Sequence, residues 1–171
     1  MIEKKTTKVK ATAKAVAFTG HREISHNHQE QVRERLKEAV LQAIRQGANK
    51  FYCGMALGFD MLAAEEVLSL KLSIPMLKLV AVVPFKGQSA SWSMVEQQWY
   101  AYILSKADDV VHLSEDYFNG CYFNGCYFKR NDYMLSHSGS VIAYFDGKPK
   151  GGTAYTCRKA REKRMPVVNV Y

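Results

Sequence analysis

Short apolar runs alternate with amphipathic segments along most of this 171-residue chain, and this alternation constrains the fold more than any other feature. Each run is continuous rather than interrupted by polar residues, which is typical of a strand buried on both faces. Gly20, Gly54 and Pro84 directly follow three of the runs and end them. We expect six strands, at residues 15–19, 50–53, 77–83, 109–113, 140–145 and 166–171.

The segments between the runs carry apolar side chains at the three- and four-residue spacing that indicates an amphipathic helix. Val32, Leu36 and Val40 show this spacing, and Gly47 follows as a C-terminal cap. We expect helices at residues 27–46, 59–72, 94–107, 129–137 and 151–163. Strands joined by such helices form parallel sheets with right-handed crossovers. The sequence therefore predicts an α/β fold, a Rossmann-like three-layer sandwich with a mainly parallel sheet of about six strands and helices on both faces.

Length and composition fit one ordinary globular domain. The chain is 47% hydrophobic and 23% charged, as in folded proteins, and no apolar run approaches the ~20 residues of a membrane span. We divide it into a basic tail at residues 1–14 and a single domain at 15–171. Because no signal-peptide-like segment follows the first lysines, we expect a cytoplasmic protein with no membrane partner. The cysteines are then expected to be free thiols, and their spacing predicts no metal site.

The formal net charge of +8 comes largely from the two ends of the chain. Five lysines lie within residues 4–14, and a second basic group lies within 158–164. We interpret the first group as a tail and the second as the solvated face of the last helix. A basic protein attracts any polyanion, so charge alone does not distinguish a nucleic acid from a nucleotide.

Ligands of parallel sheets bind at the carboxyl ends of the strands, and the first such loop reads Thr19-Gly20-His21-Arg22. Gly20 lets backbone amides approach an anion, and Arg22 offers a bidentate fork to a phosphate. The alternative is a tight turn with exposed polar residues. His21 alone is not enough to indicate acid–base chemistry.

The second loop contains Gly54, Gly58 and Asp60. The glycines bracket a turn, and the helix that follows directs its N-terminus at the crevice. Asp60 either contacts a ribose hydroxyl or caps its own helix. The loop matches neither GxGxxG nor GxxxxGK[ST], which disfavours a standard NAD site and a P-loop NTPase.

The loop after residues 140–145 gives the strongest signal. Gly151, Gly152 and Thr153 open the last helix with free amides, a hydroxyl and the positive end of the helix dipole, which together form a phosphate cradle. Asp146 precedes them as a second candidate for a ribose hydroxyl. Arg130 and Asn131 open the preceding helix, where they either reach the same crevice or form a solvated helix start.

Aromatic residues near these loops are harder to assign. Residues 117–121 are repeated unchanged as 122–126, and Tyr127-Phe128 begins a third copy. Either this is a local duplication that lengthens a loop, or it is an aromatic flap that stacks on a base. Phe85 is expected at the floor or wall of the pocket. Trp92 and Trp99 are expected in the core or in a lid.

In their order and spacing, residues 19–22, 54–60 with 63–65, 129–131 and 151–153 resemble the SLOG superfamily, which unites the DNA-processing protein DprA with the LOG phosphoribohydrolases. Within it they resemble the branch typified by the YpsA and YoqJ proteins, over residues 15–171. The resemblance implies a Rossmann-like fold of bacterial or prophage origin that binds nucleotides or ADP-ribose-like derivatives and requires no cofactor. With Thr19 and Arg130 added from the loops themselves, the expected ligand-binding residues are Thr19, Gly20, His21, Arg22, Gly54, Gly58, Asp60, Arg130, Asn131, Asp146, Gly151, Gly152 and Thr153.

Two departures from the family matter for function. The LOG enzymes use a GGxGTxxE motif, whose glutamate has no counterpart in residues 151–158, so no group in that place stabilises an oxocarbenium-like centre or activates water. Relative to the family, the tandem repeat resembles an insertion, and we expect it to reshape one wall of the pocket. We therefore expect a sensor or sequestering protein for a small nucleotide-derived ligand, with homo-oligomers possible through helices beside the pocket.

Two other functions stay open. A nucleotide phosphoribohydrolase or N-glycosidase would need a pocket carboxylate with a raised pKa. Its candidate catalytic residues are Asp60, Glu65 and Asp146, with His21 as acid–base partner. A single-stranded DNA-binding protein of DprA type would use the basic tail, the last helix and the aromatic loop.

Overall fold

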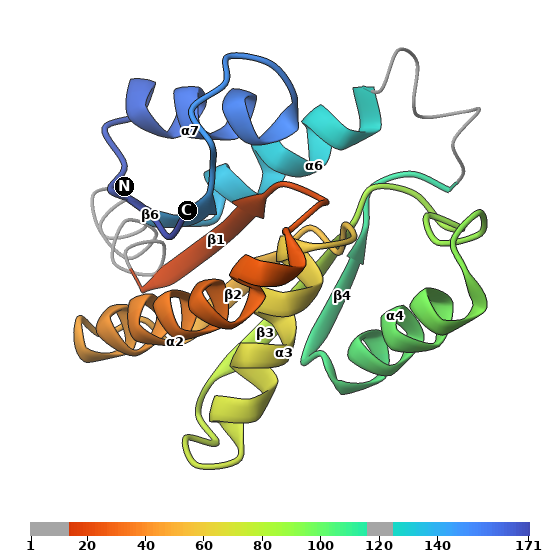
Figure 1. Cartoon of the computed structure of the whole chain (residues 1–171), viewed down its shortest axis with the longest axis horizontal. Helices are drawn as coiled ribbons and strands as arrows, with labels where there is room; N and C mark the ends of the chain where they lie inside the picture. Colours follow the sequence, from red (N-terminus) through yellow and green to blue (C-terminus); the bar gives the residue numbers. More distant parts are fainter. Residues whose placement is uncertain (1–13, 116–124) are drawn as a thin grey trace, which may run out of the picture.

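The computed structural model describes residues 14–115 and 125–171 and contains the predicted three-layer α/β sandwich (Figure 1). Nearly all of the predicted basic tail lies outside the described residues. The strands are β1 (Ala15–Gly20), β2 (Lys50–Cys53), β3 (Lys78–Val83), β4 (Asp109–His112), β5 (Ser140–Tyr144) and β6 (Val167–Asn169). The helical elements are the 3₁₀ turn η1 (His26–His28) and the α-helices α2 (Gln29–Arg45), α3 (Phe59–Lys71), α4 (Met94–Lys106), α6 (Gly125–Ser136) and α7 (Gly152–Glu162).

The six strands form one sheet in the order β4-β3-β2-β1-β5-β6, and every neighbouring pair is parallel. The chain runs from β1 outward to β4 at one edge and then returns to β5 on the other side of β1. The strand order therefore switches between β1 and β5, where ligands of such sheets bind. The two strand ends are in register there, with Gly20 opposite Tyr144.

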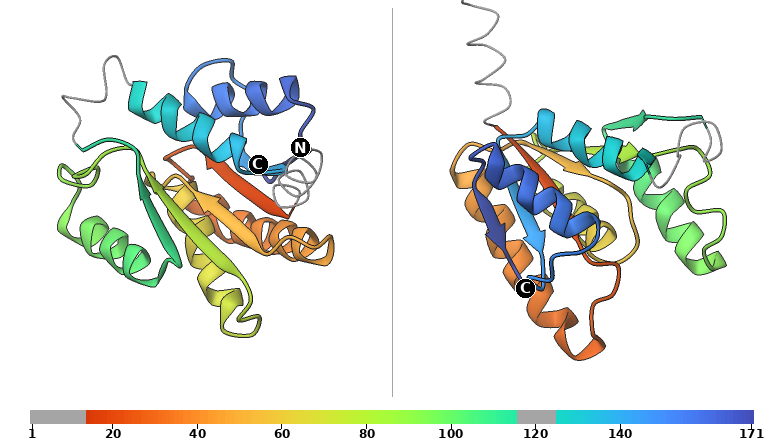
Figure 2. Two further views of the ribbon diagram at one scale, coloured as in Figure 1. Left: turned by 180° about the vertical axis from the view of Figure 1, so that it is seen from behind. Right: turned by 90° about the horizontal axis from the view of Figure 1, so that it is seen from above.

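Helices cover both faces of the sheet, as predicted. Figures 1 and 2 show α6 and α7 together on one face, and α2, α3 and α4 on the other. Successive residues of a strand point to opposite faces, so Phe18 packs into the core under α2 and α3 while Ala17 packs into the core under α6 and α7. Burial on both sides is the reason for the continuous apolar runs.

Helix α6 begins at Gly125 rather than at residue 129, so Arg130 and Asn131 lie in its second turn and do not open it. Tertiary packing extends the helix, because Cys126 is buried and the Tyr127 ring meets Phe85 with centroids 5.9 Å apart. The prediction of free thiols is confirmed for Cys53 and Cys157 but is wrong for Cys126, which is disulfide-bonded. Within the described ranges, no helix has the length and apolar character needed to cross a bilayer.

Candidate functional site

A cavity of about 520 Å³ opens at the switch point, bounded by the loop after β1 and by residues of α3, α6 and the start of α7. The expected ligand-binding residues that line it are Thr19, Gly20, His21, Arg22, Asp60, Arg130, Asn131, Gly151, Gly152 and Thr153. Gly58 and Asp146 instead line a neighbouring cavity. Gly54 lies beneath the first cavity, where its carbonyl accepts a hydrogen bond from Arg130 Nη1 at 3.0 Å. The fold thus gathers the predicted residues from four separate loops and helices.

The start of α7 forms one wall of this cavity. Gly151 is its N-cap residue, with φ +97°, no side-chain capping bond and no acidic residue in the first turn. Among the described residues, a Cβ at Gly151 would meet nothing within 4 Å, and one at Gly152 would meet only Asn131 Nδ2 at 3.6 Å. Backbone amides of an uncapped first turn have no partner within the helix and carry the positive end of its dipole. This wall has the properties of an anion site.

Asp60 and Arg130 form a buried pair of opposite charges at the base of the cavity. Their exposed fractions are 4% and 8%. Burial raises the pKa of Asp60 to about 6, against the opposing effects of Arg130 and of the Ala56 N–H, which donates to Asp60 Oδ2 at 3.3 Å. Burial likewise lowers the pKa of Arg130. Of the two expected roles of Asp60, capping of its own helix is wrong, because the N-cap residue is Gly58 and the Asp60 carboxylate accepts the Ala56 N–H, which precedes the helix.

Gly54 makes room for this pair. A Cβ at Gly54 would lie 2.8 Å from Arg130 Nε and 2.9 Å from Asp60 Oδ2. The two side chains therefore pack directly over its Cα atom. Arg130 Nε also donates to Asn131 Oδ1 at 3.1 Å, which fixes the amide of Asn131 beside the α7 start.

Two arginines flank the aromatic ring of Tyr127. Arg22 Cζ lies 5.9 Å and Arg130 Cζ 5.6 Å from the ring centroid, within the range of a cation–π contact. Tyr127 and Phe128 both line the cavity. These two residues begin the third copy of the repeat. The first copy and most of the second, at residues 117–124, lie outside the described ranges. Where it is described, the repeat supplies aromatic rings to the cavity.

His21 and Asp146 join the loops after β1 and β5. His21 Nε2 lies 3.0 Å from the Asp146 amide nitrogen and 3.0 Å from Asp146 Oδ1. A neutral Nε2 accepts the amide proton, whereas a protonated one pairs with the carboxylate. The Lys148 N–H and ammonium group contact the same carboxylate, and the backbone hydrogen bond is the main reason why the pKa of Asp146 is low. Asp146 thus remains an acceptor near neutral pH.

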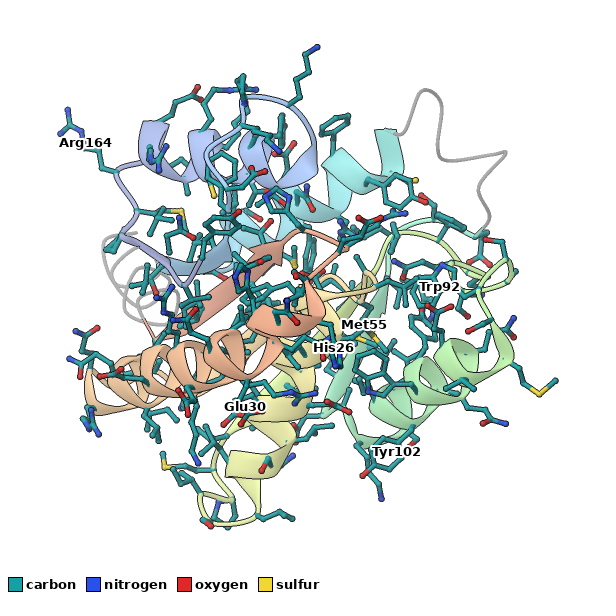
Figure 3. The ribbon with its side chains drawn as sticks, viewed as in Figure 1. His26, Glu30, Met55, Trp92, Tyr102 and Arg164 are labelled. Carbon is teal, nitrogen blue, oxygen red and sulfur yellow. The ribbon has the colours of Figure 1, made fainter. Side chains whose placement is uncertain are left out.

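Glu65 is the one catalytic candidate that lines neither cavity. Its carboxylate accepts the Trp99 indole N–H at 2.5 Å and lies 3.6 Å from Arg33 Nη1. Trp99 lines the neighbouring cavity, while Trp92 packs against the core beside α4 (Figure 3). Phe85 lies behind Tyr127 and does not line the first cavity, so its predicted place in the floor or wall is wrong.

Several residues that line the first cavity were not predicted from the sequence. They are chiefly Phe18, Ala56 and Met134, which line it together with Tyr127 and Phe128. The spacing of Tyr127 and Arg130 was an available signal, since residues three apart share a helix face. In the described part of the chain, no three His, Cys, Asp or Glu side chains gather as a metal site would require.

Comparison with known proteins agrees with this geometry. Residues 16–168 match the model of the YspA SLOG family. The SPbeta prophage-derived protein YoqJ of Bacillus subtilis is 32% identical over 129 residues, which cover 68% of this chain and 75% of YoqJ. A UPF0398 protein of Halalkalibacterium halodurans is 25% identical over 159 residues, covering 89% of this chain and 82% of that protein.

Two solved structures share the fold. One is a DNA processing protein A from Helicobacter pylori, described for its single-stranded DNA binding mode, with a TM-score of 0.60 and 18% identity over 95% of this chain and 66% of that one. The other is DprA from Streptococcus pneumoniae, with a TM-score of 0.60 and 20% identity over 91% of this chain and 49% of that one. The chain therefore corresponds to only part of each DprA chain. The family match over residues 16–168 shows that the chain belongs to the YspA SLOG family.

Proposed function

We propose that the protein binds a nucleotide or nucleotide-derived, ADP-ribose-like ligand at the carboxyl edge of its sheet, as a sensor or sequestering module. One observation carries the proposal: the uncapped start of α7 faces a cavity that Arg22 and Arg130 also line. Backbone amides and a helix dipole bind phosphate well, and guanidinium groups bind it with directed hydrogen bonds.

Each part of a nucleotide has a matching group at this edge. The phosphates bind the first-turn amides of α7 and the Thr153 hydroxyl, while Arg22, which is exposed, supplies charge. A base stacks on Tyr127. The Asp146 carboxylate, which lines the neighbouring cavity, accepts a hydrogen bond from a sugar hydroxyl of the ligand.

Non-catalytic binding is favoured because the carboxylates at the site are already engaged. Residues 151–158 hold no carboxylate. Asp60 is buried and held by the Ala56 N–H, and Asp146 is held by Lys148. A group that activates water needs a free and accessible oxygen.

Nucleotide hydrolysis is a second candidate, favoured by one observation. Asp60 lines the cavity and its pKa is raised to about 6, which is the property expected of a carboxylic acid that donates a proton to a leaving group. Single-stranded DNA binding is a third candidate, supported by the shared fold with DprA and by the net charge of +8.

The test is a thermal-shift screen of the purified protein against AMP, ADP, ADP-ribose, cyclic ADP-ribose, NAD, cyclic dinucleotides and a short single-stranded DNA. A ligand at ~100 times its dissociation constant stabilises the native state by roughly 2.7 kcal/mol, which such a screen detects. Each ligand that gives a shift is then incubated with the protein and recovered by chromatography.

Gly152→Asp places a negative charge at the α7 start, where it repels phosphate. The matched control is Met94→Asp, which places the same charge in the first turn of α4, at a side chain 75% exposed that lines neither cavity. We expect Gly152→Asp to abolish the shift and Met94→Asp to retain it, with the ligand recovered intact. Release of free base and ribose phosphate would favour the hydrolase. A shift with DNA alone, weakening steeply with salt, would contradict nucleotide binding.

A further inference from the structure

A second and larger cavity, of about 1050 Å³, adjoins the first across the loop that follows β1. His21 and Arg22 line both cavities, so this short segment is the partition between them. The loop continues into η1, which His26 marks in Figure 3, and then into α2. The two cavities therefore adjoin at the carboxyl edge of the sheet, and we call them the first and the second lobe.

Packing holds the partition in place. The Phe59 N–H donates to the His21 carbonyl at 3.2 Å, and the His21 N–H donates to the Tyr144 carbonyl at 3.3 Å. Gly58 lies so close that a Cβ there would be 2.1 Å from the Arg22 carbonyl oxygen. Backbone contacts thus fix residues 21 and 22, while the Arg22 side chain is exposed between the lobes.

The two lobes differ in chemistry. The first holds the uncapped α7 start and the buried Arg130, which suit phosphate. The second is lined by the aromatic side chains of Trp99 and Tyr144 and by the carboxylate of Asp146. Glu23 also lines this lobe. Aromatic rings and carboxylates suit the flat ring and the hydroxyl groups of a nucleoside or sugar.

We propose that the ligand is two-ended, with its phosphates in the first lobe and a second sugar or nucleoside group, attached beyond those phosphates, in the second lobe. The proposal rests on the proposed function, because it assumes that the first lobe takes phosphate. Arg22 contacts the phosphate that passes over the partition. The second lobe then distinguishes a two-ended nucleotide from a mononucleotide.

The test compares ADP with ADP-ribose, which differs by a second ribose beyond the phosphates, using titration calorimetry. Ser25 lines the second lobe, is exposed and makes no side-chain capping bond at the start of η1, so Ser25→Trp fills the lobe without disturbing the core. Asn27→Trp is the matched control, because Asn27 is exposed in the same turn and lines neither lobe.

We expect the wild-type protein to bind ADP-ribose about tenfold more tightly than ADP, the effect of one or two added hydrogen bonds. Ser25→Trp should bring the two affinities together, and Asn27→Trp should leave them apart. A direct readout comes from Trp92→Phe, which leaves Trp99 as the only tryptophan of the chain. Its fluorescence should change with ADP-ribose and stay constant with ADP.

Equal affinities for ADP and ADP-ribose, unchanged in Ser25→Trp, would overturn the second lobe as a subsite while nucleotide binding stands. Absence of binding by both compounds would instead overturn the proposed function and this inference together. Loss of ADP binding in Ser25→Trp would also contradict the inference, because it would place the phosphates in the second lobe.

Discussion

Helices α3 and α7 both have a glycine as their N-cap residue. The N-terminus of α3 is closed by packing, whereas the N-terminus of α7 is open to the first cavity. Gly58 and Gly151 are the N-cap residues, both with positive φ and without a side-chain capping bond. A Cβ at Gly58 would lie 2.1 Å from the Arg22 carbonyl oxygen, whereas a Cβ at Gly151 would meet no atom of residues 14–115 or 125–171 within 4 Å. The same residue type thus serves close packing in one place and access in the other.

The N-termini of α3 and α7 also differ in charge, and this difference likewise leaves α7 as the one that is open to a ligand. Helix α3 carries Asp60 in its first turn, and α7 carries no acidic residue there. A carboxylate near a helix N-terminus compensates the dipole. The dipole of α3 therefore has a partner within the protein, while the first turn of α7 retains its attraction for an external anion. For this reason we place the phosphates at α7 and assign α3 a structural role.

The largest expected effect comes from Gly58→Ala, which tests the closed start. Its φ of +80° strains any L-residue, and the added Cβ overlaps a backbone atom that cannot rotate away. Strain of this kind costs on the order of 1–3 kcal/mol, and overpacking adds another 1–3, so we expect the free energy of unfolding to fall by about 4 kcal/mol. Urea unfolding at constant temperature measures it.

The matched substitution is Gly151→Ala, where strain acts without overlap because the space is open. We expect a loss of roughly 1–3 kcal/mol, clearly smaller than at Gly58. Equal losses at the two positions would show that packing against Arg22 does not distinguish the two starts.

A second prediction concerns pH and the charge in the first turn of α3. Burial raises the pKa of Asp60 from 3.8 to about 6. Between these values the folded protein keeps a proton that the unfolded chain releases, so the contribution of Asp60 to stability is present below pH ~4 and is lost as the pH rises through about 6. At 1.36 kcal/mol per unit, the change is on the order of 3 kcal/mol.

Asp60→Asn isolates this contribution, because an amide does not titrate in this range. Asp108 and Asp146 have lowered pKa values and act in the opposite direction, but they do so in both proteins. The stability of the wild-type protein relative to the variant should therefore fall as the pH rises from about 4 to about 6. Parallel pH profiles in urea unfolding would mean that Asp60 titrates normally.

The sequence was sufficient to predict the α/β class, the six strands and the loops that meet at the sheet edge, because continuous apolar runs and helical spacing report burial directly. It favoured the start of α7 as the phosphate cradle, but it did not show that the start of α3 would be closed by packing. That depends on Arg22, which lies far from Gly58 in the chain and touches it only in the folded state. The start of α6 was missed for a similar reason, since the contact of Tyr127 with Phe85 extends the helix.

The second lobe was also not predicted from the sequence. Its walls come from the β1 loop, α2, α4 and β5, and no local pattern connects Trp99 with Asp146. Trp99 packs against the core, as expected, and it also lines this cavity, which was not expected. Its place in the cavity wall follows from the packing of α4 against α3, where Glu65 holds the indole N–H.

The smallest expected effect is a gain in stability rather than a loss, and it tests the open N-terminus of α7. Gly152→Asp should raise the free energy of unfolding by about 0.3–1 kcal/mol, because a carboxylate compensates the uncapped dipole of α7. Space allows it, since in the described part of the chain a Cβ at Gly152 meets only Asn131 Nδ2 at 3.6 Å. Gly152→Ala separates the charge from the added methyl group, and the difference between the two variants should shrink in 1 M salt as the charge is screened. If Asp is less stable than Ala at low salt, the amides of α7 already have a partner and the start is not open to an anion.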